Sequence, residues 1–140
     1  MRFMILLTGN ALTEAGAPPN PELLAAMGAY NEALVEAGVM QGGDGLQPTA
    51  RGARVRFAGS ERSVTRGPFS DRTVTGYWIF KTGSLEEAIE WVKRCPNPTG
   101  ETGEIEIRQL YDPEDFAESD PTGELRRKEA ELAARIQRQA

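Results

Sequence analysis

The chain has 140 residues, a length that suits one domain whose folding hides about two-thirds of its extended surface. It carries 16 basic and 21 acidic residues, no histidine and a single cysteine, Cys95. This composition excludes Ser-His-Asp and Cys-His catalytic sites and an intramolecular disulfide, and it predicts no metal and no other cofactor.

The net charge of −5 is unevenly distributed along the chain. Residues 51–80 carry +4, and six arginines supply the positive charge: Arg51, Arg54, Arg56, Arg62, Arg66 and Arg72. This segment suits the attraction of a small anion. The acidic remainder and the lack of an aromatic platform predict no nucleic-acid partner.

The cell compartment is predicted from the lone thiol and the chain start. A single cysteine is typical of a reducing compartment. The opening run "MRFMILLT" is too short for a signal core with a cleavage site and far too short to span a bilayer. We therefore expect a cytoplasmic protein without membrane contact.

The first predicted elements are a strand and a helix. Residues 4–7 form a continuous apolar run, which is typical of a strand covered on both faces. Residues 11–20 are interpreted as a loop, and a helix follows with Asn20 as N-cap, Pro21 at its first position and Gly38 beyond its end. Helical spacing predicts its core-facing stripe: Leu23, Leu24, Met27, Tyr30, Asn31, Leu34 and Val35.

The next segment, "MQGGDGLQPT", lacks the Lys and Ser/Thr of a phosphate-binding loop, so we expect a bent connection between helix and sheet. Residues 53–65 then predict a hairpin, "ARVRF" and "RSVT" around "AGSE". Strand alternation places Val64 and Arg66 on one face. If that face points inward, Arg66 needs a cavity, a ligand or an acidic partner: Asp71, Asp44 or a residue of another subunit.

The second half repeats the strand-helix-strand order. "VTGYWIFK" predicts a strand that is apolar on both faces, and Ser84 with Glu87 predicts a capping box that opens a helix up to a buried, inert Cys95. A turn over residues 95–103, a strand in "EIEIRQLY" and a C-terminal helix follow.

This order predicts an α+β, ferredoxin-like fold with an antiparallel or mixed sheet, for residues 1–118, and a helical extension over residues 119–140. Two helices cover only one sheet face. Since both central strands are apolar on both faces, we expect a homodimer that joins the open sheet faces of two copies.

The chain resembles the YCII-related proteins that carry the DGPF motif. The resemblance rests on "PELLAAMGAYNEALVEAGV", "ARVRF", "GPF", "GYWIF", "SLEEAIEWVKRCPNP" and "GEIEIRQLYDPEDF". It implies a bacterial, dimeric, ferredoxin-like domain of the dimeric α/β barrel type, with a cleft near the GPF turn and no agreed reaction. Relatives are credited with a His and Asp acid-base pair, which this chain lacks because it has no histidine.

The signature position departs from the family pattern, since Arg66 stands where an aspartate is expected. Gly67, Pro68 and Phe69 match, so the corner's shape is expected to be kept with reversed charge. No catalytic or metal-binding residue is named. The candidate ligand-binding residues are Arg66, Phe69, Asp71, Asp44 and Trp78.

Two functions remain open. The first is a dimeric module that binds an anionic small molecule or regulates through it. The second is an enzyme that uses carboxylate and arginine chemistry near the GPF turn, without histidine or metal. We favour the binding module, because turn capping or surface pairing is the commoner role for such side chains.

Overall fold

A computed structural model of the chain describes residues 1–97 and 102–140. The chain forms two compact units, Met1–Gln109 and Leu110–Ala140. The boundary expected after residue 118 stays a prediction. The turn expected over residues 95–103 lies partly outside the described residues. Within those residues, no helix is long and apolar enough to cross a membrane.

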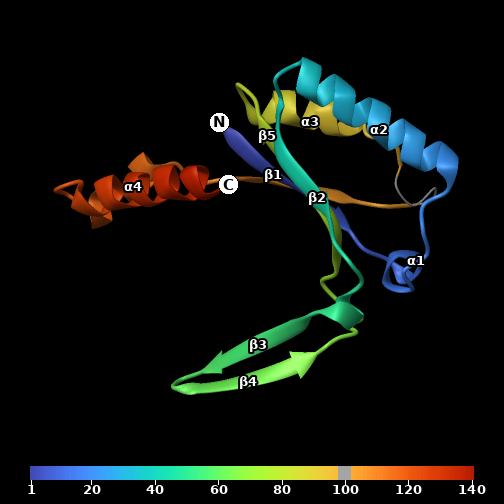
Figure 1. Cartoon of the computed structure of the whole chain (residues 1–140), viewed down its shortest axis with the longest axis horizontal. Coiled ribbons are helices and arrows are strands. Elements are labelled where there is room, and N and C mark those ends of the chain that lie inside the picture. The colour runs from blue at the N-terminus through green and yellow to red at the C-terminus, as the bar shows by residue number, and fades with distance from the viewer. Residues whose placement is uncertain (98–101) are drawn as a thin grey trace. The chain divides into compact units, whose positions relative to one another are not determined.

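The first unit is built on a four-stranded antiparallel sheet in the order β2 (Met40–Gly45), β5 (Val74–Lys81), β1 (Arg2–Thr8), β6 (Ile105–Gln109) (Figure 1). The chain passes through strand, helix and strand twice, with β1 and β5 in the centre. This arrangement confirms the α+β class and is consistent with a ferredoxin-like fold.

Two helices, α2 (Pro21–Glu36) and α3 (Leu85–Lys93), lie together on one face of this sheet (Figure 1). Both begin at the predicted caps. The Leu23 N–H donates to Asn20 Oδ1 at 2.7 Å, and the Glu87 N–H donates to Ser84 Oγ at 3.1 Å. The predicted capping box is only half formed, because the Glu87 carboxylate accepts from the Gly83 N–H instead.

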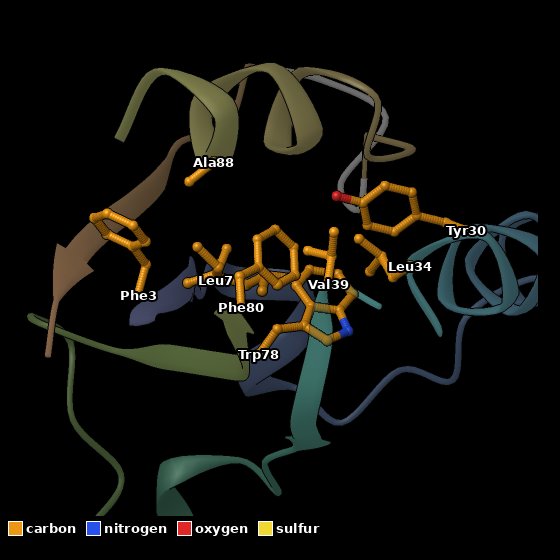
Figure 2. Close-up of a cluster of buried hydrophobic side chains, with 9 residues drawn as sticks. Phe3, Leu7, Tyr30, Leu34, Val39, Trp78, Phe80 and Ala88 are labelled. Atoms are coloured by element: carbon orange, nitrogen blue, oxygen red, sulfur yellow. The ribbon is translucent and has the colours of Figure 1, made fainter. Parts of the chain in front are cut away.

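The core lies between these helices and the sheet (Figure 2). It contains the inward residues of β1 and β5 and one face of each helix: Phe3, Ile5, Leu7, Tyr30, Leu34, Val39, Trp78, Phe80 and Ala88. The predicted stripe of α2 is wrong at Leu24 and Val35, which are exposed. The opposite sheet face carries the half-buried Met4 and Leu6 of β1 and Tyr77 and Ile79 of β5.

Two segments interpreted as irregular are regular. Residues 40–45 form edge strand β2 rather than a bend, and Ala11–Glu14 form a short helix, α1, inside the expected loop. In α1 the Asn10 side chain accepts from the Thr13 N–H at 3.0 Å, and the Asn10 N–H donates to Thr13 Oγ1 at 2.8 Å. Local hydrogen bonding by Asn10 and Thr13 thus defines this turn of helix.

The predicted hairpin forms, but outside the main sheet. Strands β3 (Ala53–Ala58) and β4 (Glu61–Arg66) make a two-stranded sheet of their own, which follows a single 3₁₀ turn, η1 (Thr49–Arg51) (Figure 1). These strands do not join the main sheet, because β2 takes the place next to β5.

The second unit consists of the 3₁₀ segment η2 (Pro113–Ser119) and helix α4 (Glu124–Gln139). Asp120 is buried and joins them. Its carboxylate accepts from the Leu125 and Arg126 N–H groups at 3.2 and 3.0 Å, and it pairs with the Arg126 guanidinium at 3.1 Å. The apolar residues of α4 are exposed: Leu125, Leu132 and Ile136.

Candidate ligand-binding site

The Gly67-Pro68-Phe69 corner packs directly against the 3₁₀ turn η1. A Cβ on Gly67 would lie 1.8 Å from the Thr49 carbonyl oxygen, so only glycine fits this approach. The Gly67 N–H donates to the Gly52 carbonyl at 3.0 Å, and the Gly67-Pro68 peptide is cis. Gly67 is thus placed by backbone contacts to Thr49 and Gly52.

Thr49 links this corner to helix α1. Its hydroxyl accepts from the Phe69 N–H at 2.8 Å and donates to the Glu14 carboxylate. The Thr49 N–H also donates to Glu14 Oε1, at 3.3 Å. Both Glu14 oxygens are therefore engaged by one residue, and the GPF corner, η1 and α1 form one connected wall.

Asp71 is paired with Arg54 and Arg72. Arg54 Nη1 and Arg72 Nε each lie 3.1 Å from a carboxylate oxygen of Asp71, and Arg54 Nη2 donates to the Asp71 carbonyl. The Arg54 guanidinium also lies 3.9 Å from the centre of the Phe69 ring. Hydrogen bonds from Arg54, then Arg72, lower the pKa of Asp71, which keeps it ionised and unsuited to donate a proton.

Arg66 does not take part in this cluster. It is exposed and lies opposite Ala53 in the hairpin, and no side chain in residues 1–97 or 102–140 pairs with its guanidinium. The expected inward face is also wrong, because Val64 on the same face is exposed. The hairpin has no inward side within the described chain, since it stands apart from the main sheet.

The remaining two candidates lie on the four-stranded sheet. Asp44 is exposed on β2 and accepts from the Tyr77 hydroxyl at 3.3 Å. Trp78 is a core residue. Its indole N–H donates to Asn31 Oδ1 at 2.9 Å, and its ring meets that of Tyr30 edge-on at 5.5 Å (Figure 2). The structure therefore brings together Phe69 and Asp71, with Arg54 in the place expected for Arg66.

A groove of about 720 Å³ lies beside this wall in the first unit. It lies between residues 10–20, the first turns of α2 and residues 45–48, and Pro48 joins it to Thr49. Leu12, Leu24 and Leu46 are exposed along it. None of the 18 described residues that line it is ionisable.

The groove was not predicted from the sequence, because its lining combines residues 10–20 and 45–48, which were interpreted as irregular, with the first turns of α2. The exposure of Leu12, Leu24 and Leu46 depends on how residues 10–20, helix α2 and residues 45–48 pack together, which the local sequence does not specify. Two polar side chains of the groove are unengaged: Gln47 and Thr75 make no side-chain hydrogen bond within the described residues. They supply uncharged hydrogen-bonding groups to the lining of the groove.

Comparison with known proteins identifies the family of the chain. The sequence model of the YCII-related domain matches residues 1–124. The chain belongs to the YCII-related domain family. It is also 30% identical over 86 residues to "Uncharacterized protein R00369" of Rhizobium meliloti (strain 1021), which covers 60% of this chain and 69% of that protein. The family is thus established, and the relative's description adds no reaction.

The described residues contain no group of three or more His, Cys, Asp or Glu side chains able to share a metal. Cys95 packs against the core, and burial raises the pKa of its thiol to about 11. A thiol of that kind is protonated at neutral pH and is a poor nucleophile. The predicted reading of Cys95 as an inert thiol fits this geometry.

Proposed function

We propose that this YCII-related chain is a cytoplasmic small-molecule binding module that works as a dimer, with its ligand in the groove between α1, α2 and β2. The observation that carries the proposal is the groove itself. Its volume lies within the usual range of ligand sites, and its lining is apolar with a few polar groups. Asp71 is paired with Arg54 and Arg72 and stays ionised, so it is not available as a general acid.

The lining favours an uncharged ligand with an apolar body. A buried ligand charge needs a partner, and the described lining offers none. Gln47 and Thr75 suit a hydroxyl, carbonyl or amide group. The anionic ligand expected from residues 51–80 is the alternative, and it would bind at the corner, where Arg54 and Arg72 are already occupied by Asp71.

The dimer is proposed from the sheet face opposite the helices. Met4, Leu6, Tyr77 and Ile79 form an apolar patch in the middle of this face, and Arg108 and Glu106 of β6 pair at its edge at 3.3 Å. In a two-fold dimer the same patch of a second copy would cover this one, because such an interface buries the same surface on both subunits. The lone cysteine supports the cytoplasmic location.

A matched pair of probes tests the ligand site. 2-Naphthol and 2-naphthoate differ mainly in charge, and each is titrated while the melting temperature and the leucine methyl NMR signals are followed. We expect 2-naphthol to shift the signals of Leu12, Leu24 and Leu46. A ligand at a hundred times its Kd stabilises the folded state by about 2.7 kcal/mol.

Two leucines of equal exposure supply the variant and its control. Leu24 lies in the groove and is 63% exposed, whereas Leu125 lies in the second unit and is 62% exposed. We expect Leu24→Glu to abolish 2-naphthol binding and Leu125→Glu to leave it unchanged. Binding of 2-naphthoate alone, lost in Arg72→Met, would instead establish the anion site at the corner. No response to either probe would contradict the groove as a ligand site.

A further inference from the structure

We propose that hairpin β3–β4 is an arm that binds a second copy of this chain through the face carrying Val55, Phe57 and Val64. The inference rests on the proposed self-association and adds a second contact to it. It assigns a role to Arg66 and to the positive segment, which the ligand groove does not use.

The hairpin is a two-stranded sheet that stands beyond the end of the main sheet (Figure 1). An isolated hairpin of this kind is marginally stable in water and normally needs packing against another surface. Its base is closed by the Gly67–Gly52 hydrogen bond and is held to the GPF corner by the Arg54–Asp71 pair. The arm is thus attached firmly at one end and uncovered along its length.

One face of the hairpin is apolar. The strand register places Val55 opposite Val64 and Phe57 opposite Arg62, so these side chains share a face. Val55, Phe57 and Val64 are 51%, 70% and 61% exposed. The Arg62 guanidinium lies 4.3 Å from the centre of the Phe57 ring, and Arg66 ends the same face beside Ala53. The face is therefore an apolar centre with a cation at each end, which is the pattern of a protein-binding surface.

The net charge of the hairpin favours a second copy of this chain as its partner. Residues 53–66 contain four arginines and one glutamate, a net charge of +3, so the other 126 residues carry −8 of the chain's total of −5. The rest of a second copy is thus opposite to the arm in net charge. The same −8 repels a nucleic-acid backbone, so a β-ribbon that binds DNA is the less favoured occupant.

The two hairpin faces provide a matched pair of substitutions. Arg66 shares the apolar face, whereas Arg56 lies opposite Ser63 on the other face. We measure the dimer dissociation constant of the full chain by analytical ultracentrifugation in 0.05 and 0.5 M NaCl. Arg66→Glu and Phe57→Ser are expected to weaken dimerisation at least tenfold at low salt, while Arg56→Glu changes it less than twofold. The higher salt is expected to weaken the wild-type dimer.

A third variant separates this inference from the sheet-face dimer. Leu6→Glu alters the open sheet face and leaves the hairpin intact. A dimer lost in Leu6→Glu but unchanged by Arg66→Glu and Phe57→Ser would overturn the arm and keep the sheet-face contact. A dimer weakened by the hairpin variants but retained in Leu6→Glu would keep the arm and overturn the sheet-face contact.

Two further outcomes contradict the arm outright. One is a wild-type chain that stays monomeric at 100 μM. The other is tight binding of a 20-base-pair DNA duplex at 0.1 M salt that Arg66→Glu abolishes without any change in self-association. Trp78 fluorescence and the cross-strand NMR contact between Val55 and Val64 show that each variant keeps its core and its hairpin.

Discussion

The Arg54 guanidinium lies 3.1 Å from the Asp71 carboxylate, although Arg66 is the arginine closer to Asp71 in sequence. Arg54 opposes Thr65 in the hairpin, so it occupies the face opposite to that of Arg66. The alternation of a strand therefore decides which arginine faces the GPF corner. Arg66, where the family resemblance led us to expect an aspartate, therefore lies on the hairpin face that points away from Asp71.

This relationship predicts different effects for two equal substitutions. Arg54→Met removes the pair with Asp71 and the stack on Phe69, and the stack alone is worth about 1 kcal/mol. We expect a lower free energy of unfolding in urea for Arg54→Met and no change for Arg66→Met in monomeric protein at low concentration. Equal losses in the two variants would contradict the assignment of Arg54 to the corner.

A second prediction concerns the approach of Gly67 to η1. Gly67→Ala places a Cβ 1.8 Å from the Thr49 carbonyl oxygen, and backbone must move to relieve the clash. We expect a loss of about 2 to 3 kcal/mol or more. Gly28→Ala is the control, because Gly28 lies inside α2 with open space around it, and alanine there should add about 1 kcal/mol. Urea unfolding of both variants checks the opposite signs.

A third prediction compares two tyrosine hydroxyls. The Tyr30 hydroxyl donates to the Trp91 carbonyl at 2.7 Å, and burial raises the pKa of Tyr30. Tyr30→Phe removes this hydrogen bond from a half-buried site, at a cost of about 1 kcal/mol, while the Trp91 carbonyl still accepts from the Arg94 N–H at 3.1 Å. Tyr77→Phe removes only an exposed contact to Asp44 and should change stability by less than about 0.5 kcal/mol. A smaller loss for Tyr30→Phe than for Tyr77→Phe would refute this account.

The fourth prediction is the acid response of the second unit. Burial opposes ionisation of Asp120, but hydrogen bonds from Arg126 and Leu125 outweigh it and lower its pKa. A lowered pKa stabilises the folded unit above the unfolded value of about 3.9, and the contribution is lost as pH falls through the folded pKa. We expect the Leu125 and Arg126 amide signals to persist at pH 5 and to disappear at lower pH. In Asp120→Asn the two amide signals should already be weakened at pH 7. If their pH dependence in Asp120→Asn equals that of the wild type, the Asp120 carboxylate does not stabilise the second unit.

The fold class was predictable from local patterns, whereas parts of the site were not. Asn20 and Ser84 mark their helices by short-range hydrogen bonds, and the alternation of Trp78 and Phe80 marks the buried side of β5. β2 was missed because glycine is rare in strands. Glycine is required at position 43 by Trp78, which is distant in sequence, because a Cβ on residue 43 would lie 2.7 Å from the Trp78 side chain.

The position of Arg66 also could not be predicted from local sequence patterns. Its parity with Val64 was predicted correctly, but parity tells only which residues share a face and not whether anything covers that face. The covering surface depends on whether the hairpin joins the main sheet, which is a question of topology. Asp120 was missed too, because its N–H partners lie five and six residues along the chain, beyond Gly123.

The central position of β1 has a consequence for biosynthesis. β1 pairs with β5 on one side and with β6 on the other, so its partners are separated from it by most of the first unit. Sheets built from such distant contacts fold slowly, because long loops must close before any pairing is gained. On the ribosome, the first-made strand has no complete sheet to join until residue 109 has emerged. Its apolar face is exposed meanwhile, and nascent chains truncated within β6 should be more protease-sensitive than those that extend beyond Gln109.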